Sequence, residues 1–136
     1  MQGHDDWLKK SLSDLKMAKK GLKDDDDTLD CAVYHVHQCA EKVLKSYFAF
    51  KNKTIERTHD LEYLLKICSE IDFDFLALKE DVKKLNPFAV QSRYPDDRFC
   101  IDRYEAEEAV KRAKKVFDFV KNKIENPDKN MNIFKN

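Results

Sequence analysis

The histidines and cysteines of one periodic segment are the first residues whose spacing suggests chemistry. Cys31, His35 and Cys39 follow one another at intervals of four residues. On an α-helix, eight residues span about 12 Å of the axis, because each residue rises about 1.5 Å. A tetrahedral zinc site gathers its ligands within about 4 Å, so three ligands with this spacing do not close around one ion. We therefore expect thiols and imidazoles without a metal.

A second set of polar residues offers binding or acid-base chemistry. At 100° per residue, the side of segment 28–51 opposite its apolar stripe carries His35, Gln38, Glu41, Lys42 and Lys45. Arg57 and His59 follow this segment, and Arg93 and Tyr94 lie in a late loop. An arginine, a histidine and a phenol brought together can bind phosphate or cleave RNA by acid-base chemistry. The same residues also suit capping and ion pairing, so the spacing leaves both interpretations open.

Amphipathic helices must position these residues. Apolar side chains at helical spacing predict helices over about residues 5–22, 28–51, 73–85 and 102–125, and one more that begins with Thr58 as its N-cap. Residues 87–101 form a long non-periodic stretch, and such a loop in a compact helical domain is often functional. The sequence thus predicts an all-α, up-and-down bundle of four main helices plus one shorter helix.

Composition narrows the class of protein. The 136 residues carry 26 Lys and Arg against 26 Asp and Glu, enough chain for one domain and no net charge to attract nucleic acid in general. Two glycines exclude the glycine-rich loops that hold phosphate in dinucleotide-binding and P-loop folds. No apolar run approaches the ~20 residues of a membrane span. Any contact with a nucleotide must therefore come from a local patch.

The ends, the cysteines and one acidic run complete these expectations. Met1–Lys10 carries four charges and no apolar core, so we expect no secretory signal and a cytoplasmic protein whose four cysteines are buried thiols. We expect one domain over residues 1–125 and a fraying tail over 126–136. Asp24–Asp27 predicts a solvated turn, with Asp27 or Thr28 capping the next helix. This acidic turn would offset a comparatively basic face on the second helix and around Arg93–Arg103.

Four motifs occur in order along the chain. Trp7 lies in a leucine-rich first helix, and HQCAEKVLK (37–45), RTHDL (57–61) and SRYP (92–95) follow. Together they resemble the HEPN domain family, the domain shared by higher-eukaryote and prokaryote nucleotide-binding proteins, over about residues 5–125. The resemblance implies a bundle similar to the C-terminal domain of kanamycin nucleotidyltransferase, commonly a homodimer.

The resemblance also implies a site and a partner. The polar motif positions of the family fall on Gln38, Glu41, Lys42, Lys45, His59, Arg93, Tyr94 and Pro95. It implies a nucleotide such as ATP as the candidate ligand, with no other cofactor. It further implies a homodimer that serves as accessory subunit to a separate minimal nucleotidyltransferase, in a toxin–antitoxin-like system.

One departure from the family affects the expected mechanism. Ribonucleases of the superfamily carry an arginine followed four to six residues later by a histidine near the start of the last helix. The histidines here are His4, His35, His37 and His59, and none follows the arginines of the late loop. We therefore expect no catalytic residues. Two alternatives stay open: a metal-independent ribonuclease that uses Arg93 or Arg98 with His59, and a purely structural dimerisation module in which Glu41 pairs with lysines across the dimer.

Overall fold

Five α-helices make up most of the described chain, which covers residues 3–23, 25–89 and 101–127 of a computed structural model. They are α1 (His4–Lys20), α2 (Leu29–Phe50), α3 (Leu61–Ile71), α4 (Lys79–Leu85) and α5 (Arg103–Glu125). Three short 3₁₀ helices accompany them, η1 (Asp26–Thr28), η2 (Phe73–Leu78) and η3 (Asn86–Ala89). No strand occurs in these ranges, so the predicted all-α bundle of four main helices and one shorter helix is confirmed.

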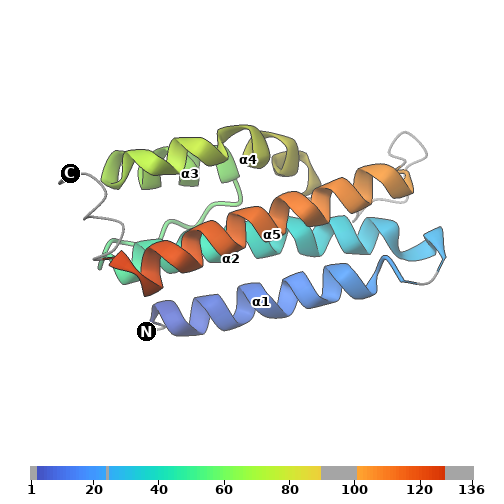
Figure 1. The fold of residues 1–136 in the computed structure, drawn as a ribbon, viewed down its shortest axis with the longest axis horizontal. Coiled ribbons are helices and arrows are strands. Elements are labelled where there is room, and N and C mark those ends of the chain that lie inside the picture. Colours follow the sequence, from blue (N-terminus) through green and yellow to red (C-terminus); the bar gives the residue numbers. More distant parts are fainter. Residues whose placement is uncertain (1–2, 24, 90–100, 128–136) are drawn as a thin grey trace.

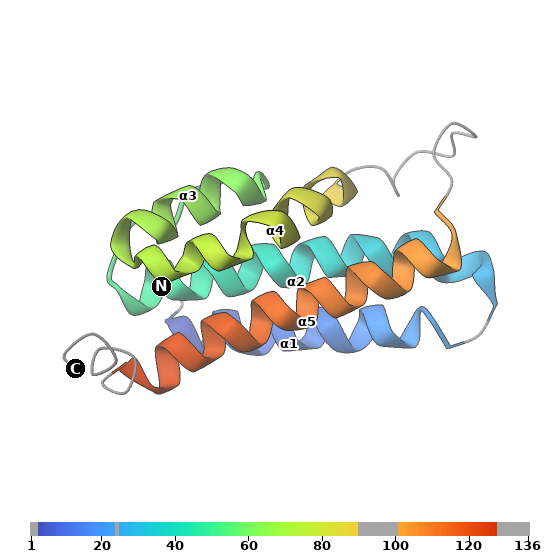
Figure 2. The same cartoon turned by 45° about the horizontal axis from the view of Figure 1, so that its top comes forward.

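The helix α2 lies at the centre of the bundle. Figures 1 and 2 show α1 and α5 along one side of it, with α3 and α4 covering another side. Contacts join α2 to α1, α5, α3 and η3. The linker of residues 51–60 contains no helix and passes back along α2, because its last residues contact the middle of that helix. Because α2 is central, other segments contact it on several sides. These contacts decide the environment of its polar residues.

The predicted apolar stripe of α2 is buried. Val33, Val36, Ala40 and Val43 are fully inaccessible, and Tyr47 is 2% exposed. Facing them are apolar residues of the other helices, among which the largest buried are Phe75, Leu61, Leu64, Leu78 and Leu85. In α1, by contrast, Leu12 is 38% exposed although it lies at helical spacing with the buried Leu15.

Two helix starts test the predicted caps. The third helix begins at Leu61, and its N-cap is Asp60, whose Oδ1 accepts from the backbone N–H groups of Glu62 (3.1 Å) and Tyr63 (3.3 Å). Thr58 was therefore the wrong cap; its hydroxyl accepts from the N–H of Asp60 (3.1 Å) and fastens the preceding turn. An aspartate placed directly before the first turn satisfies two otherwise free amides, whereas a residue two positions earlier cannot reach them.

The last helix, α5, has the cap that the Asp102-x-x-Glu105 spacing in the sequence predicts. Asp102 accepts from the N–H of Glu105 at 2.8 Å. At the α1–α2 turn, by contrast, Thr28 occupies the N-cap position without a capping bond, because its hydroxyl donates to the carbonyl of Gly21 (2.7 Å). The acidic turn instead binds α5, since Asp26 Oδ1 lies 3.0 Å from Nε of Arg103. The predicted helix over 73–85 is divided into η2 and α4.

Candidate functional site

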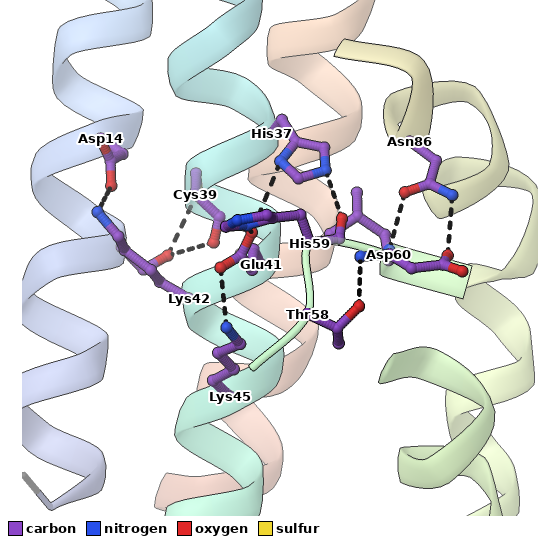
Figure 3. A network of polar contacts seen from close by, with 12 residues as sticks. Asp14, His37, Cys39, Glu41, Lys42, Lys45, Thr58, His59, Asp60 and Asn86 are labelled. Atoms are coloured by element: carbon purple, nitrogen blue, oxygen red, sulfur yellow. Dashed lines mark hydrogen bonds and ion pairs between the residues drawn. The ribbon is translucent and has the colours of Figure 1, made fainter. Parts of the chain in front are cut away.

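A buried carboxylate ties α1 to the polar side of α2. Asp14 is 7% exposed, and its two oxygens lie 2.8 Å from Nδ1 of His35 and 2.7 Å from Nζ of Lys42. Figure 3 shows the Lys42 contact. A carboxylate held by two partners from the neighbouring helix fixes how α1 packs on α2. His35 and Lys42 are therefore committed in part to their own fold.

A second buried carboxylate organises the centre of Figure 3. Glu41 is 5% exposed; its Oε2 accepts from Nζ of Lys45 (2.9 Å) and its Oε1 lies 2.8 Å from Nδ1 of His59. Lys45 is itself only 6% exposed, and its ammonium lies 6.0 Å from the centroid of the Trp7 ring on α1. We call Glu41, Lys45 and His59 together with His37 the Glu41 cluster.

His37 is the buried histidine that holds the linker in place. It is fully buried, and its Nε2 lies 2.9 Å from the backbone carbonyl of His59, so Nε2 carries the proton and donates. Its Nδ1 has no hydrogen-bond partner within the described ranges and lies 3.9 Å from Oε1 of Glu41. Burial lowers the pKa of His37, and this effect exceeds the opposite influence of Glu41. His37 is thus a neutral positioning residue, and the predicted site residues did not include it.

His59 is the exposed member of the Glu41 cluster. Its side chain is 66% exposed, although Nδ1 is held by the buried carboxylate. A carboxylate accepts only from a protonated nitrogen, so Nδ1 carries a proton and Nε2 is left for other partners. When the ring is neutral, Nε2 accepts a hydrogen bond; when the ring is charged, Nε2–H donates to an anion. This geometry can bind a phosphate oxygen or transfer a proton.

The prediction of an outward polar face on α2 was wrong for Glu41 and Lys45. Both are buried, because α1 and the linker of residues 51–60 cover that side of the helix. Gln38 is half-buried and makes no hydrogen bond within the described ranges. The lysines that were expected to make this face basic instead face carboxylates. His59, from the linker, remains the most exposed of the predicted site residues in the part of the chain that the structure describes.

The late loop begins beside this cluster. Asn86 of η3 accepts from the N–H of Leu61 (2.8 Å) and donates to Oδ1 of Asp60 (3.0 Å), next to His59 in the chain. Arg93, Tyr94 and Pro95 lie outside the described residues. From Asn86 to Arg93 the chain can span at most about 25 Å, at ~3.6 Å per residue. Convergence of Arg93 and Tyr94 with His59 stays a prediction.

The described cysteines differ in burial, and the potential metal ligands around them form no cluster of three. Within the described ranges no group of three or more His, Cys, Asp or Glu side chains is arranged to hold a metal ion. Cys39 and Cys68 are buried, as predicted, and burial raises the pKa of the Cys39 thiol to about 12. The prediction was wrong for Cys31, which is exposed near the start of α2.

Comparisons with known proteins identify the family. Residues 4–123 match the HEPN domain. The crystal structure of TT1696 from Thermus thermophilus is 29% identical, with a TM-score of 0.77 over 90% of this chain and 99% of that one. ST0689, an archaeal HEPN homologue, is 25% identical, with a TM-score of 0.73 over 91% of this chain and 99% of that one. The domain match spans most of the sequence, so the chain belongs to the HEPN family.

No functionally curated protein shows a significant match to this sequence. Among the helices in the described ranges, none is both long and apolar enough to cross a membrane.

Proposed function

We propose that this protein is a nucleotide-binding HEPN module whose His59 contacts the phosphate of a nucleotide such as ATP. One observation carries the proposal: the buried Glu41 carboxylate fixes Nδ1 of His59 at 2.8 Å, while the ring itself is 66% exposed. A histidine that is oriented in this way presents Nε2 to a ligand without losing freedom on binding. Membership of the HEPN family supports the nucleotide as the ligand class.

The charges of the cluster favour an anion once His59 is protonated. Glu41 and Lys45 carry opposite charges 2.9 Å apart, so a protonated His59 leaves the cluster with a net positive charge. Lys42 is paired with Asp14 at 2.7 Å, so in the proposed complex it attracts the phosphate through its charge more than through direct contact. In the proposed complex, Arg93 supplies a bidentate phosphate contact, and Tyr94 stacks on the ligand or donates a hydrogen bond.

Isothermal calorimetry with ATP tests the phosphate contact. A charge-assisted hydrogen bond contributes about 1.5–3 kcal/mol, so His59→Ala should weaken ATP binding about ten- to hundredfold. Arg93→Ala should weaken it similarly. His4→Ala is the matched control, because His4 contacts Phe50 at the far end of α2 and should leave affinity unchanged. Absence of ATP binding in the wild type, with and without the partner subunit, would refute the ligand assignment.

We further propose that the module is a homodimer and an accessory subunit of a minimal nucleotidyltransferase in a toxin–antitoxin-like system. The family membership supports both parts. Sedimentation equilibrium at micromolar concentration should return twice the mass of 16.1 kDa. A monomer at these concentrations would contradict the dimer. Co-expression with a nucleotidyltransferase encoded beside it should give a complex that survives size-exclusion chromatography, and separate elution would contradict the partnership.

A metal-independent ribonuclease is the second candidate, and one observation favours it. The Glu41–His59 bond is the arrangement by which a carboxylate sets the tautomer of a histidine general base. Incubation with RNA in EDTA distinguishes the two functions. Cleavage that is lost in His59→Ala supports the enzyme, whereas an inert wild type excludes it.

A further inference from the structure

A pocket separate from the Glu41 cluster lies between the α4–η3 segment and the first half of α5. Its volume is about 310 Å³, and none of its lining residues belongs to the cluster. Small-molecule sites in proteins are usually about 300–1,000 Å³, so this pocket suits a small ligand. The helix η3 connects the pocket with the Glu41 cluster. Asn86 donates a hydrogen bond to Asp60, the neighbour of His59 in the chain, and Phe88, two residues later, lines the pocket.

Two aromatic side chains form part of the pocket wall. Phe88 comes from η3 and packs in part against the core, while Tyr104 comes from the first turn of α5. Tyr104 is 71% exposed, although its hydroxyl donates to Oε1 of Glu108 at 3.2 Å. That bond restricts the ring and leaves its apolar surface in contact with solvent. A flat aromatic ligand would remove this surface from water.

The polar part of the pocket is held in place by a buried carboxylate. Nη1 of Arg112 donates to Oδ1 of Asp81 at 3.0 Å, and Asp81 is 2% exposed. Lys115 pairs with the other oxygen of Asp81 at 2.9 Å. No other hydrogen bond engages the guanidinium of Arg112 within the described ranges. Arg112 is thus a fixed cation with unused donors at the pocket.

Among the described residues that line the pocket, the charges cancel. Lys84 and Arg112 contribute two positive charges, and Glu105 and Glu108 contribute two negative ones. Two carboxylates disfavour an isolated phosphate, whereas a neutral planar heterocycle with donors and acceptors on its edge can use both signs. We propose that this pocket binds a nucleobase, with Tyr104 and Phe88 against its face and Glu108 and Arg112 at its edge. The inference rests on the proposed function for its ligand class and assigns the base a place distinct from the phosphate contact.

Nucleosides, which lack phosphate, test the pocket on its own. Adenosine, guanosine, cytidine and uridine are titrated into the full chain by calorimetry, and at least one of them should bind. Stacking of a base on an aromatic side chain corresponds to an about five- to 150-fold difference in affinity, so Tyr104→Ala should weaken binding by that factor. Tyr104→Phe should retain most of it. Tyr63→Ala is the matched control, because Tyr63 is 41% exposed on α3 and does not line the pocket.

The results separate this inference from the proposed function. Absence of binding for all four nucleosides, or equal nucleoside binding by Tyr104→Ala and the wild type, overturns the proposal that this pocket binds a nucleobase. ATP binding that requires His59 but not Tyr104 also overturns the pocket and leaves the proposed function standing. Nucleoside binding that requires Tyr104, with ATP bound equally by wild type and His59→Ala, supports the pocket and removes the phosphate site. Because Tyr104 is largely exposed, its substitution should leave the melting temperature unchanged.

Discussion

Substitution of Glu41 by glutamine tests the central polar cluster most directly. The change keeps the size of the side chain and removes its charge. Lys45, 6% exposed and 2.9 Å from Glu41 in the native protein, then keeps a positive charge with no carboxylate beside it. His59 loses the charged partner that fixes its Nδ1. The protein should therefore become less stable, and the orientation of His59 should be lost at the same time.

The expected magnitude follows from burial. Removing one partner of a buried ion pair destabilises a protein by about 3–5 kcal/mol, because the other charge stays desolvated and uncompensated. Unfolding entropy is about 2.1 cal/mol/K per residue, so for 136 residues a loss of this size lowers Tm by about 10–17 °C. Since folded domains are stable by about 5–15 kcal/mol, the variant should still fold at room temperature unless the native protein lies near the lower end of that range.

Urea unfolding and thermal melts, both followed by circular dichroism, measure the effect. Asp118→Asn is the control, because Asp118 forms an i,i+4 pair with Lys114 at 2.6 Å in which both side chains are more than half exposed. Such an exposed pair contributes about 0.3–0.5 kcal/mol. The double substitution Glu41→Gln with Lys45→Met removes the stranded charge and should recover most of the stability.

Two results would refute this reasoning. If Glu41→Gln lowered the free energy of unfolding no more than Asp118→Asn, the Glu41–Lys45 pair would be solvated like a surface pair. If the additional Lys45→Met substitution recovered nothing, the loss would come from something other than the unpaired ammonium. Either outcome would also weaken the claim that a buried carboxylate orients His59.

Two further predictions concern titration and thiol reactivity. Because burial lowers the pKa of His37 in the folded protein below its ordinary 6.5, the unfolded chain binds the proton more readily. The free energy of unfolding should therefore be highest above about pH 6.5 and should fall below that pH by at most about 1.4 kcal/mol per pH unit. His37→Gln should flatten this slope in urea titrations. An unchanged slope would contradict the assignment. Cys39 and Cys68 are buried, and burial raises the pKa of both thiols. The variant Cys31→Ser/Cys100→Ser should therefore show no reaction with Ellman's reagent at pH 8 until it is unfolded, when two thiols should appear; rapid native labelling would refute this burial.

The helices themselves were largely determined by local sequence. The stripe from Leu29 to Phe50 repeats every three or four residues, and this periodicity alone predicted α2 and its buried apolar side. The cap at Asp102 was also predictable, since it depends on residues three positions apart. The start of α3 was predicted wrongly, because Thr58 and Asp60 are both good caps and the choice depends on how the linker lies against α2.

The candidate site was predicted by residue type and only partly by environment. The sequence selected Glu41, Lys45 and His59, yet helical spacing placed the first two on an outward face. Periodicity reports which side of a helix is apolar, and it says nothing about a polar side that another segment covers. The pocket at Tyr104 was missed for a related reason, since its walls come from segments on either side of the late loop.

The sequence by itself determined the all-helical class, the apolar core of α2 and the HEPN resemblance, because these depend on short-range periodicity and on motifs that persist along the chain. The tertiary structure alone decided that the linker of residues 51–60 returns along α2. That path buries Glu41 and Lys45 together and leaves His59 outside with one nitrogen held. Burial of a charge depends on what packs over it, and in this protein the covering segments, α1 and the linker, lie outside α2 itself.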